Sequence, residues 1–275
     1  MSDLYRPLKE GYEFNGSEFW SEGWAMFKKE AGTFIGVTVL FIIINVVVAF
    51  IPFVNFLGTF IQVTLFGGYY LYCRKMQTGE QTMGDFFGGF SSFGQIVLYL
   101  LVFGLMVVPV FLIGIFAVLP YEELIALVGN MDDPGAISDL SMAMMDKMGL
   151  IVAIIFALMF YVIYLTMSYI FVLPLIVDGK LGFWQAMELS RKVVGKQFFS
   201  FFGFYLLLGI LGGIFTILTL FFGVFVLYPA LYCTFFVMYN RVFKLDEVVN
   251  VDEIESFGTS SDDINTESQE RSTEH

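Results

Sequence analysis

The longest stretch of this chain without a charged side chain is Phe198–Asn240, FFSFFGFYLLLGILGGIFTILTLFFGVFVLYPALYCTFFVMYN. As a single α-helix, these residues would be roughly 64 Å long, at about 1.5 Å per residue. The hydrocarbon core of a bilayer is only about 30 Å thick. The stretch therefore predicts two membrane-spanning helices, with a turn near Phe221–Gly223.

Further stretches without charged residues each have the length of one crossing: Ala31–Ile51, Phe56–Cys73, Phe93–Pro120 and Gly149–Val177. The chain is 57% hydrophobic and contains 34 Phe, which excludes a disordered or an ordinary soluble protein. The stretches are continuously apolar rather than alternating, which argues against a β-barrel. We expect an all-α, polytopic membrane protein with six transmembrane helices, at about 31–51, 56–73, 94–119, 149–176, 198–220 and 224–241.

The positions of Lys and Arg predict how the chain is threaded through the membrane. All of the 14 basic residues except Lys147 fall in the termini or in the loops after the second and fourth predicted spans. Because loops rich in Lys and Arg stay in the cytoplasm, we expect both termini to be cytoplasmic. Residues 1–30 lack the pattern of a cleavable signal peptide, so the first span is expected to be permanent.

Acidic residues gather in two other segments. Residues 245–275 contain ten Asp and Glu against Arg271, which predicts an acidic, disordered cytoplasmic tail. This tail either solvates the chain end or docks a membrane-protein partner. The outer loop Tyr121–Met148 is also acidic, with a predicted helix over Ile137–Met148. We expect this loop to form a soluble cap rather than a metal site, because its spacing matches no calcium-binding loop.

Three segments on the predicted cytoplasmic side are amphipathic. In the first, Phe19, Trp20, Trp24 and Phe27 share one helical face. The segment 183–194 repeats this plan, and 83–90 is a shorter, glycine-rich version. Aromatic residues with nearby Lys favour helices at the level of the lipid headgroups. We expect cytoplasmic interfacial helices before the first, third and fifth spans.

The same segments indicate an internal repeat. Lys28-Lys29-x-x-Gly32 matches Arg191-Lys192-x-x-Gly195 in residue type and spacing. Each repeat would contain one interfacial helix and one transmembrane hairpin, used three times. Chance similarity in a chain rich in Phe, Leu and Gly is the alternative, and the short motifs agree with both interpretations.

Two motifs near the fourth and fifth spans resemble a known family. The sequence LPLIVD at Leu173–Asp178 precedes GFWQAMELSRK at Gly182–Lys192, which leads into a glycine-rich span. In these motifs and in layout, the chain resembles the six-span bacterial membrane domains found with glycerophosphodiester phosphodiesterases and their stand-alone YciC-like relatives. The resemblance implies a fold and a bacterial cytoplasmic (inner) membrane location. It implies no activity, because in that family the phosphodiesterase chemistry belongs to a separate soluble barrel domain.

The sequence predicts no catalytic, cofactor-binding or metal-ligating residues. The only histidine is His275, the last residue, which argues against His-based metal sites and catalytic triads. The predicted spans contain no acidic or basic side chain, whereas ion-coupled transporters usually place one there. We therefore expect a protein that is not an enzyme and has no cofactor and no nucleic-acid partner.

A few uncharged residues within the spans are candidate contact sites. Asn45 and Gln62 each lie seven residues from the predicted turn Pro52–Asn55, which places them at matching depths. We expect them to bond to each other as a structural contact, with a substrate contact as the alternative. Gly209 and Gly213 form a Gly-x-x-x-Gly motif, which predicts close helix packing within one chain or between two copies.

These observations favour a non-enzymatic integral membrane protein that organises or adapts lipids or other membrane proteins. A passive or partner-driven transporter of an apolar or lipid-like solute is the alternative. An intramembrane enzyme is a third and weaker hypothesis, because only loop carboxylates would be available for catalysis. The transporter hypothesis predicts a cavity between the spans that is lined by polar residues such as Asn45 or Gln62.

Overall fold

The computed structural model describes residues 3–50, 54–119, 121, 125, 128–129 and 134–243. Within these ranges the chain is helical and contains no strand, which confirms the all-α class. The predicted tail, the tip of the first hairpin and much of the outer loop lie outside the described residues. The elements are η1 (Asp3–Tyr5), α1 (Arg6–Lys9), α2 (Gly16–Lys29), α3 (Ala31–Ala49), α4 (Val54–Thr78), η2 (Met83–Ser92), α5 (Phe93–Val118), α7 (Pro134–Asp146), α8 (Met148–Ser168), α9 (Val172–Val177), α10 (Phe183–Lys196), α11 (Phe198–Leu218) and α12 (Val224–Phe243).

Among the described residues, the segments long and apolar enough to cross a membrane are Ala31–Ala49, Met83–Val118, Met148–Val177 and Phe198–Leu218. The chain is accordingly a multi-pass membrane protein. The helices α4 and α12 occupy the second and sixth predicted spans but do not meet the same criterion. Both are rich in tyrosine and carry amide side chains, which lower their hydropathy. The turn predicted near Phe221–Gly223 is confirmed, since it separates α11 from α12.

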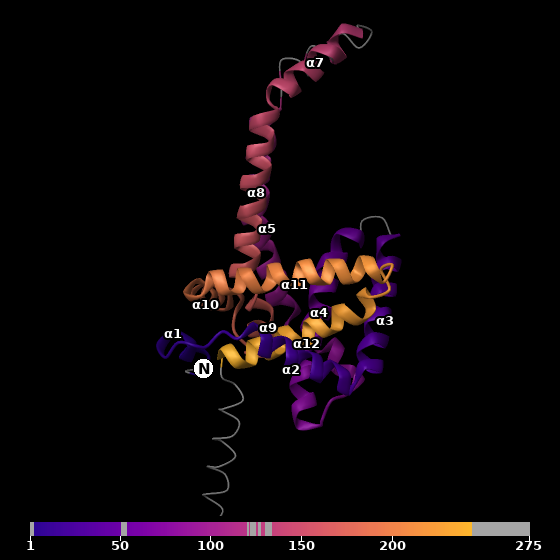
Figure 1. Cartoon of the computed structure of the whole chain (residues 1–275), viewed down its shortest axis with the longest axis vertical. Helices are drawn as coiled ribbons and strands as arrows, with labels where there is room; N and C mark the ends of the chain where they lie inside the picture. Colours follow the sequence, from indigo (N-terminus) through magenta and orange to yellow (C-terminus); the bar gives the residue numbers. More distant parts are fainter. Residues whose placement is uncertain are drawn as a thin grey trace, which may run out of the picture.

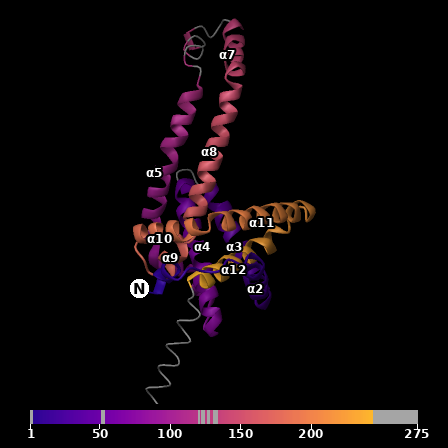
Figure 2. The ribbon, with the colours of Figure 1, turned by 60° about the vertical axis from the view of Figure 1, so that its left-hand side comes forward.

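The helices α5 and α8 form a long antiparallel hairpin that rises from the rest of the chain, with α7 at its far end (Figures 1 and 2). Gly114 of α5 allows α5 and α8 to approach each other closely, because a Cβ atom there would lie 3.2 Å from Ile154 and from Leu158. The outer parts of both helices otherwise expose apolar side chains, and Ile113 is 68% exposed. A helix that is apolar on all sides is stable when hydrocarbon surrounds it.

The remaining long helices form the body of the protein. The helices α3 and α4 pack together, and α12 packs against both of them and along α2. The helix α11 begins near the base of α8 and runs away from it at a steep angle, instead of running beside it (Figures 1 and 2). The six long helices therefore do not form one side-by-side bundle. The α5–α8 hairpin joins the body mainly at its base, where α4, α9 and α10 contact it.

Ser190 of the GFWQAMELSRK motif and Asp178 of the LPLIVD motif stabilise the base of the α5–α8 hairpin. The helical segment that begins at Met148 is interrupted between α8 and α9, and the Ser190 hydroxyl of α10 fills the interruption. Its Oγ donates to the carbonyl of Ser168 at 2.8 Å and accepts from the backbone N–H of Phe171 at 3.2 Å. Asp178, directly after α9, forms an ion pair with Arg74 of α4. Buried backbone groups at the break are thus satisfied within the protein.

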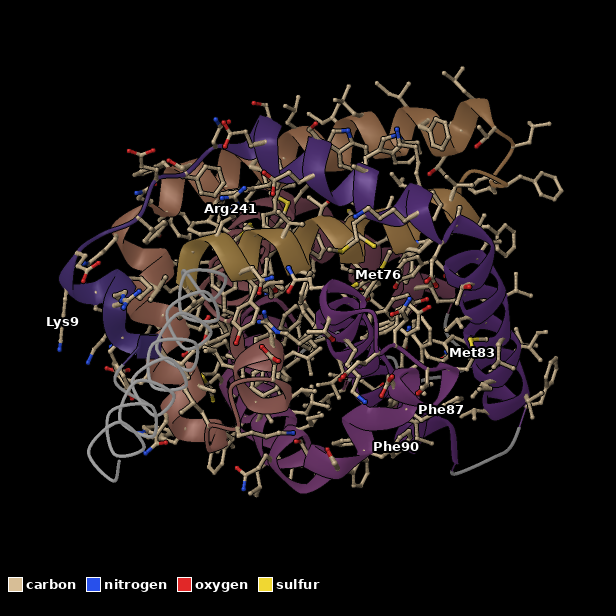
Figure 3. The ribbon with its side chains drawn as sticks, turned by 90° about the horizontal axis from the view of Figure 1, so that it is seen from below. Lys9, Met76, Met83, Phe87, Phe90 and Arg241 are labelled. Atoms are coloured by element: carbon tan, nitrogen blue, oxygen red, sulfur yellow. The ribbon has the colours of Figure 1, made fainter. Side chains whose placement is uncertain are left out.

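The segment η2 is a 3-10 helix rather than the predicted α-helix, and it lies against α4. Its buried residues Phe86 and Gly89 face α4. Met83, Phe87 and Phe90 project from the other side, as seen from below in Figure 3. The apolar surface of this segment is therefore shared between the core and the outside of the protein.

Candidate functional site

An apolar cavity lies between α2 and α11, and we call it the α2–α11 groove. It has a volume of about 690 Å³, within the range of small-molecule sites. Its lining is almost entirely apolar. The lining residues are Phe14, Gly16, Ser17, Trp20, Trp24, Phe199, Ser200, Gly203, Phe204, Leu207, Leu208, Leu211, Gly212, Phe215, Val226 and Leu227.

The residue types on α2 and α11 account for the two walls of the groove. On α2, Trp20 and Trp24 are one turn apart and stack with ring centroids 5.9 Å apart. On α11, Gly203 has no side chain to fill the space, and no atom lies within 4 Å of where its Cβ would be. The helix α2 is held in place because Gly23 lies directly on the backbone of Thr234 in α12. Aromatic residues on one helix and a glycine on the other leave an open apolar channel between them.

A second cavity contains both polar residues that the sequence singled out, and we call it the Asn45 cavity. It has a volume of about 400 Å³ and lies between α3, α4 and the start of α12. The lining residues are Thr38, Phe41, Ile42, Asn45, Val46, Ala49, Gln62, Phe66, Tyr69, Val224 and Tyr228. The structure thus brings Asn45 and Gln62 to one cavity.

The hydrogen bonds in this cavity differ from the expected pair. No hydrogen bond joins Asn45 to Gln62 among the described residues. The Asn45 amide Nδ2 donates instead to the carbonyl of Phe41, one turn earlier, at 2.8 Å. At the end of the cavity farthest from the turn between α3 and α4, the hydroxyls of Thr38 and Tyr69 lie 2.8 Å apart and connect the two helices. Within this cavity, the hydrogen bond between α3 and α4 is therefore made by Thr38 and Tyr69 rather than by the two amides.

Among the described residues, none packs against the predicted packing glycines of α11. Gly209 and Gly213 are exposed, with no atom within 4 Å of an added Cβ. Their neighbour Gly212 is buried instead, and a Cβ there would lie 2.9 Å from Leu227. Packing of Gly209 and Gly213 between two copies stays a prediction.

The closest glycine contacts join α4 to η2, and the Gly-x-x-x-Gly motif did not predict them. A Cβ on Gly68 would overlap the carbonyl group of Phe86, and one on Gly89 would overlap the carbonyl oxygen of Thr64. The available signal was a pair of Gly-Gly dipeptides, Gly67-Gly68 and Gly88-Gly89. Neither dipeptide fits the Gly-x-x-x-Gly pattern, so a search limited to that motif passes over them.

Charged residues cluster at the base, where they serve as structural contacts. The Tyr72 hydroxyl donates to one carboxylate oxygen of Glu30, and the Gln81 amide donates to the other at 2.6 Å. These bonds stabilise the ionised form and lower the pKa of Glu30. Arg241 of α12 pairs with Glu22 of α2 at 2.6 Å, at the surface. Such pairs join helices but leave no carboxylate positioned in either cavity among the described residues.

The described part of the chain offers few side chains that could hold a cofactor. No cluster of three His, Cys, Asp or Glu residues there could hold a metal ion. The thiols of Cys73 and Cys233 are free and buried. The linings of the two cavities are apolar or uncharged, which suits apolar and uncharged ligands. No protein-family model, no curated protein and no solved structure matches this chain at a significant level.

Proposed function

We propose that this chain is a six-span protein of a bacterial cytoplasmic membrane, with both termini in the cytoplasm. The helices α4 and α12 would supply the two further crossings, since each follows an apolar helix after a short connection. A helix of 20 residues such as α12 reaches about 30 Å, the thickness of the hydrocarbon core. The location also draws on the family resemblance of the motifs that contain Asp178 and Ser190.

The steep angle between α11 and α8 has to be reconciled with six membrane crossings. The outer parts of α5 and α8 contact mainly each other, so packing does not hold their inclination to the body. In a bilayer, the hydrocarbon thickness would set this angle instead. The exposed aromatic side chains near the base, including Trp184 at 64% exposure, suit the headgroup region. They support the predicted interfacial role of α2, η2 and α10.

A topology experiment tests this proposal. Single cysteines placed at Ser2, Gly135 and Ser260, in a chain with Cys73 and Cys233 changed to Ala, would be labelled with a membrane-impermeant maleimide. We expect labelling from outside only at position 135, and labelling at the other two only after the membrane is opened. Labelling of position 2 or 260 in intact cells would exclude the proposed topology, in which both termini are cytoplasmic.

We infer that the protein is a non-enzymatic lipid-binding organiser of the membrane. The observation that carries this function is the apolar α2–α11 groove of about 690 Å³, with two stacked Trp residues on one wall. A lipid acyl chain is the apolar ligand that the surrounding bilayer supplies. The hydroxyls of Ser17 and Ser200 add two polar groups to the lining. No charged group among the described lining residues opposes an apolar chain.

Groove filling provides the test. Gly203→Phe places a ring in the groove, whereas Gly209→Phe places the same ring on an exposed part of the same helix. Native mass spectrometry after mild extraction would report the lipids retained by each variant. We expect Gly203→Phe to lose bound lipid and Gly209→Phe to keep it. Equal retention by both variants would rule out the groove as the lipid site.

A transporter is the second candidate function, and the Asn45 cavity favours it because the cavity lies between membrane helices. Transport requires that the solute leaves on the other side of the membrane. Uptake of a short-chain fluorescent lipid into proteoliposomes separates the two functions. An organiser gives no uptake above that of empty vesicles, whereas a transporter gives uptake that Asn45→Leu reduces.

Partner binding by the acidic tail remains part of the proposal. Removal of residues 245–275 leaves both cavities unchanged in their described linings. Mild extraction of the full and the shortened chain would show whether a co-purifying membrane protein depends on the tail. Identical sets of co-purifying proteins would assign the tail a solvating role.

A further inference from the structure

The Asn45 cavity differs from the α2–α11 groove in its hydrogen-bonding groups. Asn45 and Gln62 carry side-chain amides, and each amide has two N–H donors and one carbonyl acceptor. Asn45 uses one donor for the carbonyl of Phe41. Among the described residues, none donates to the Asn45 carbonyl oxygen or bonds to the Gln62 amide. Two amides therefore line one cavity, and both have hydrogen-bonding capacity that no described residue uses.

The surroundings make this capacity costly in the absence of a ligand. Both amides are half-buried, and the rest of the lining is mainly aliphatic and aromatic, as at Phe41, Phe66 and Val46. An amide placed in an apolar environment without a partner loses the hydrogen bonds that water would provide. Since α3 has the length and hydropathy of a membrane span, water is scarce on this side of the protein. A bound molecule with hydrogen-bonding oxygens would remove the cost.

The charge of that molecule follows from the lining. The described residues around the cavity include no Asp, Glu, Lys, Arg or His. A charged ligand would be buried against apolar groups without an opposite charge, which is unfavourable. The volume of about 400 Å³ accepts the polar part of an amphiphile but not an entire lipid. Exposed residues of α3 beside the cavity, such as Ile43 and Val47, offer an apolar surface for its chains.

The depth of the amides agrees with such a ligand. Asn45 lies four residues before the end of α3, or about 6 Å along the helix axis. The 19 residues of α3 span roughly 28 Å, close to the hydrocarbon thickness. Asn45 thus lies just inside one edge of the hydrocarbon core, and Gln62 lines the same cavity. Ester and hydroxyl groups of membrane lipids occur next to this edge.

We propose that the Asn45 cavity binds a neutral glycerolipid, whose ester and hydroxyl oxygens bond to the amides of Asn45 and Gln62. The proposal requires that α3 spans the membrane, and it is independent of the α2–α11 groove. Thr38 and Tyr69 already bond to each other, so they close the end of the cavity farthest from the turn rather than compete for the ligand. Binding would proceed from the bilayer, without a path through water.

Dioleoylglycerol serves as the probe, with hexadecane as the probe that lacks oxygens. Binding to the purified full chain would be measured by native mass spectrometry. Asn45→Leu and Gln62→Leu keep the size of the side chain but remove the amide. We expect each variant to bind dioleoylglycerol about tenfold more weakly and to bind hexadecane unchanged. Thr216→Val is the matched control, because Thr216 bonds to the Gly212 carbonyl of its own helix and does not line this cavity.

Two further variants distinguish binding in the Asn45 cavity from binding in the α2–α11 groove and from a failure to fold. Gly203→Phe blocks the groove, so dioleoylglycerol that still binds to this variant in an Asn45-dependent manner occupies the Asn45 cavity. If the leucine variants fail to fold, Val46→Trp narrows the same cavity from the half-exposed side of α3 and should also weaken binding. Unchanged binding of dioleoylglycerol by Asn45→Leu and Gln62→Leu would overturn the proposal, whatever the result for the groove. Loss of hexadecane binding together with dioleoylglycerol binding would overturn it as well.

Discussion

Arg74 holds Asp178 with two hydrogen bonds, from Nη2 to Oδ2 at 2.8 Å and from Nε to Oδ1 at 3.2 Å. The pair links the end of α4 to the turn after α9, across 104 residues of sequence. The guanidinium also lies over the ring of Phe236 in α12, with 5.3 Å between Cζ and the ring centroid. Three helices that are distant in the sequence therefore meet at one side chain. Asp178 ends the LPLIVD motif, so this motif residue has a structural role.

Loss of this ion pair is expected to destabilise the base. Arg74→Lys keeps the charge but removes the two-pronged geometry, and Asp178→Asn removes the charge. We expect each change to lower the free energy of unfolding by about 1–3 kcal/mol, because both side chains are largely buried. The measurement is thermal or denaturant unfolding in detergent. Arg191→Lys is the control, since its pair with Glu188 is exposed and should contribute less than about 1 kcal/mol.

Glycine substitutions should separate the two kinds of glycine in this chain. Gly68→Ala and Gly89→Ala force α4 away from η2, and we expect each to cost about 1–3 kcal/mol in stability. Gly209→Ala and Gly213→Ala place a methyl group in open space within a helix. They should leave stability unchanged or raise it by up to about 1 kcal/mol. A large loss at Gly209 or Gly213 in detergent would instead show that these glycines pack against a second copy.

Ser190→Ala tests the break between α8 and α9. The substitution leaves the buried N–H of Phe171 and the carbonyl of Ser168 without their shared partner. We expect a loss of about 1–3 kcal/mol, measured by unfolding in detergent. Ser190→Thr restores the hydroxyl and should recover part of this loss. Full stability of the alanine variant would mean that other groups satisfy the break.

The lowered pKa of Glu30 predicts an acid-sensitive joint between α2 and α3. Hydrogen bonds from Tyr72 and then Gln81 stabilise the ionised carboxylate in the folded protein. A carboxyl whose folded pKa lies below its unfolded value stabilises the fold above the unfolded pKa, near about 4.3. This contribution is lost as the pH falls through the folded pKa. We expect Glu30→Gln to reduce the melting temperature at pH 7 and to flatten its dependence on pH below about 5. Parallel pH profiles for the two proteins would contradict this assignment.

Much of the helical layout was predictable, because hydropathy and helix length are local properties. The turn between α11 and α12 falls where the long apolar stretch Phe198–Asn240 required it. Asn45 and Gln62, which the spacing about a short turn places at matching depths, both line one cavity. Their missing mutual bond was not predictable, since Asn45 turns to the Phe41 carbonyl of its own helix. A side-chain rotation of this kind leaves no trace in residue spacing.

The sequence alone therefore determined that the chain is a helical membrane protein, since apolar stretches of this length are stable only when lipid hydrocarbon surrounds them. The predicted bounds of the first, third, fifth and sixth spans lie within two residues of α3, α5, α11 and α12, whereas α4 continues to Thr78 and α8 ends at Ser168. Only the tertiary structure decided which glycines make contacts, and it selected Gly68 and Gly89 over Gly209 and Gly213. It also created the α2–α11 groove and gave Asp178 and Ser190 their partners. The physical reason is that crossing points between helices depend on packing between segments far apart in the chain, which no local pattern encodes.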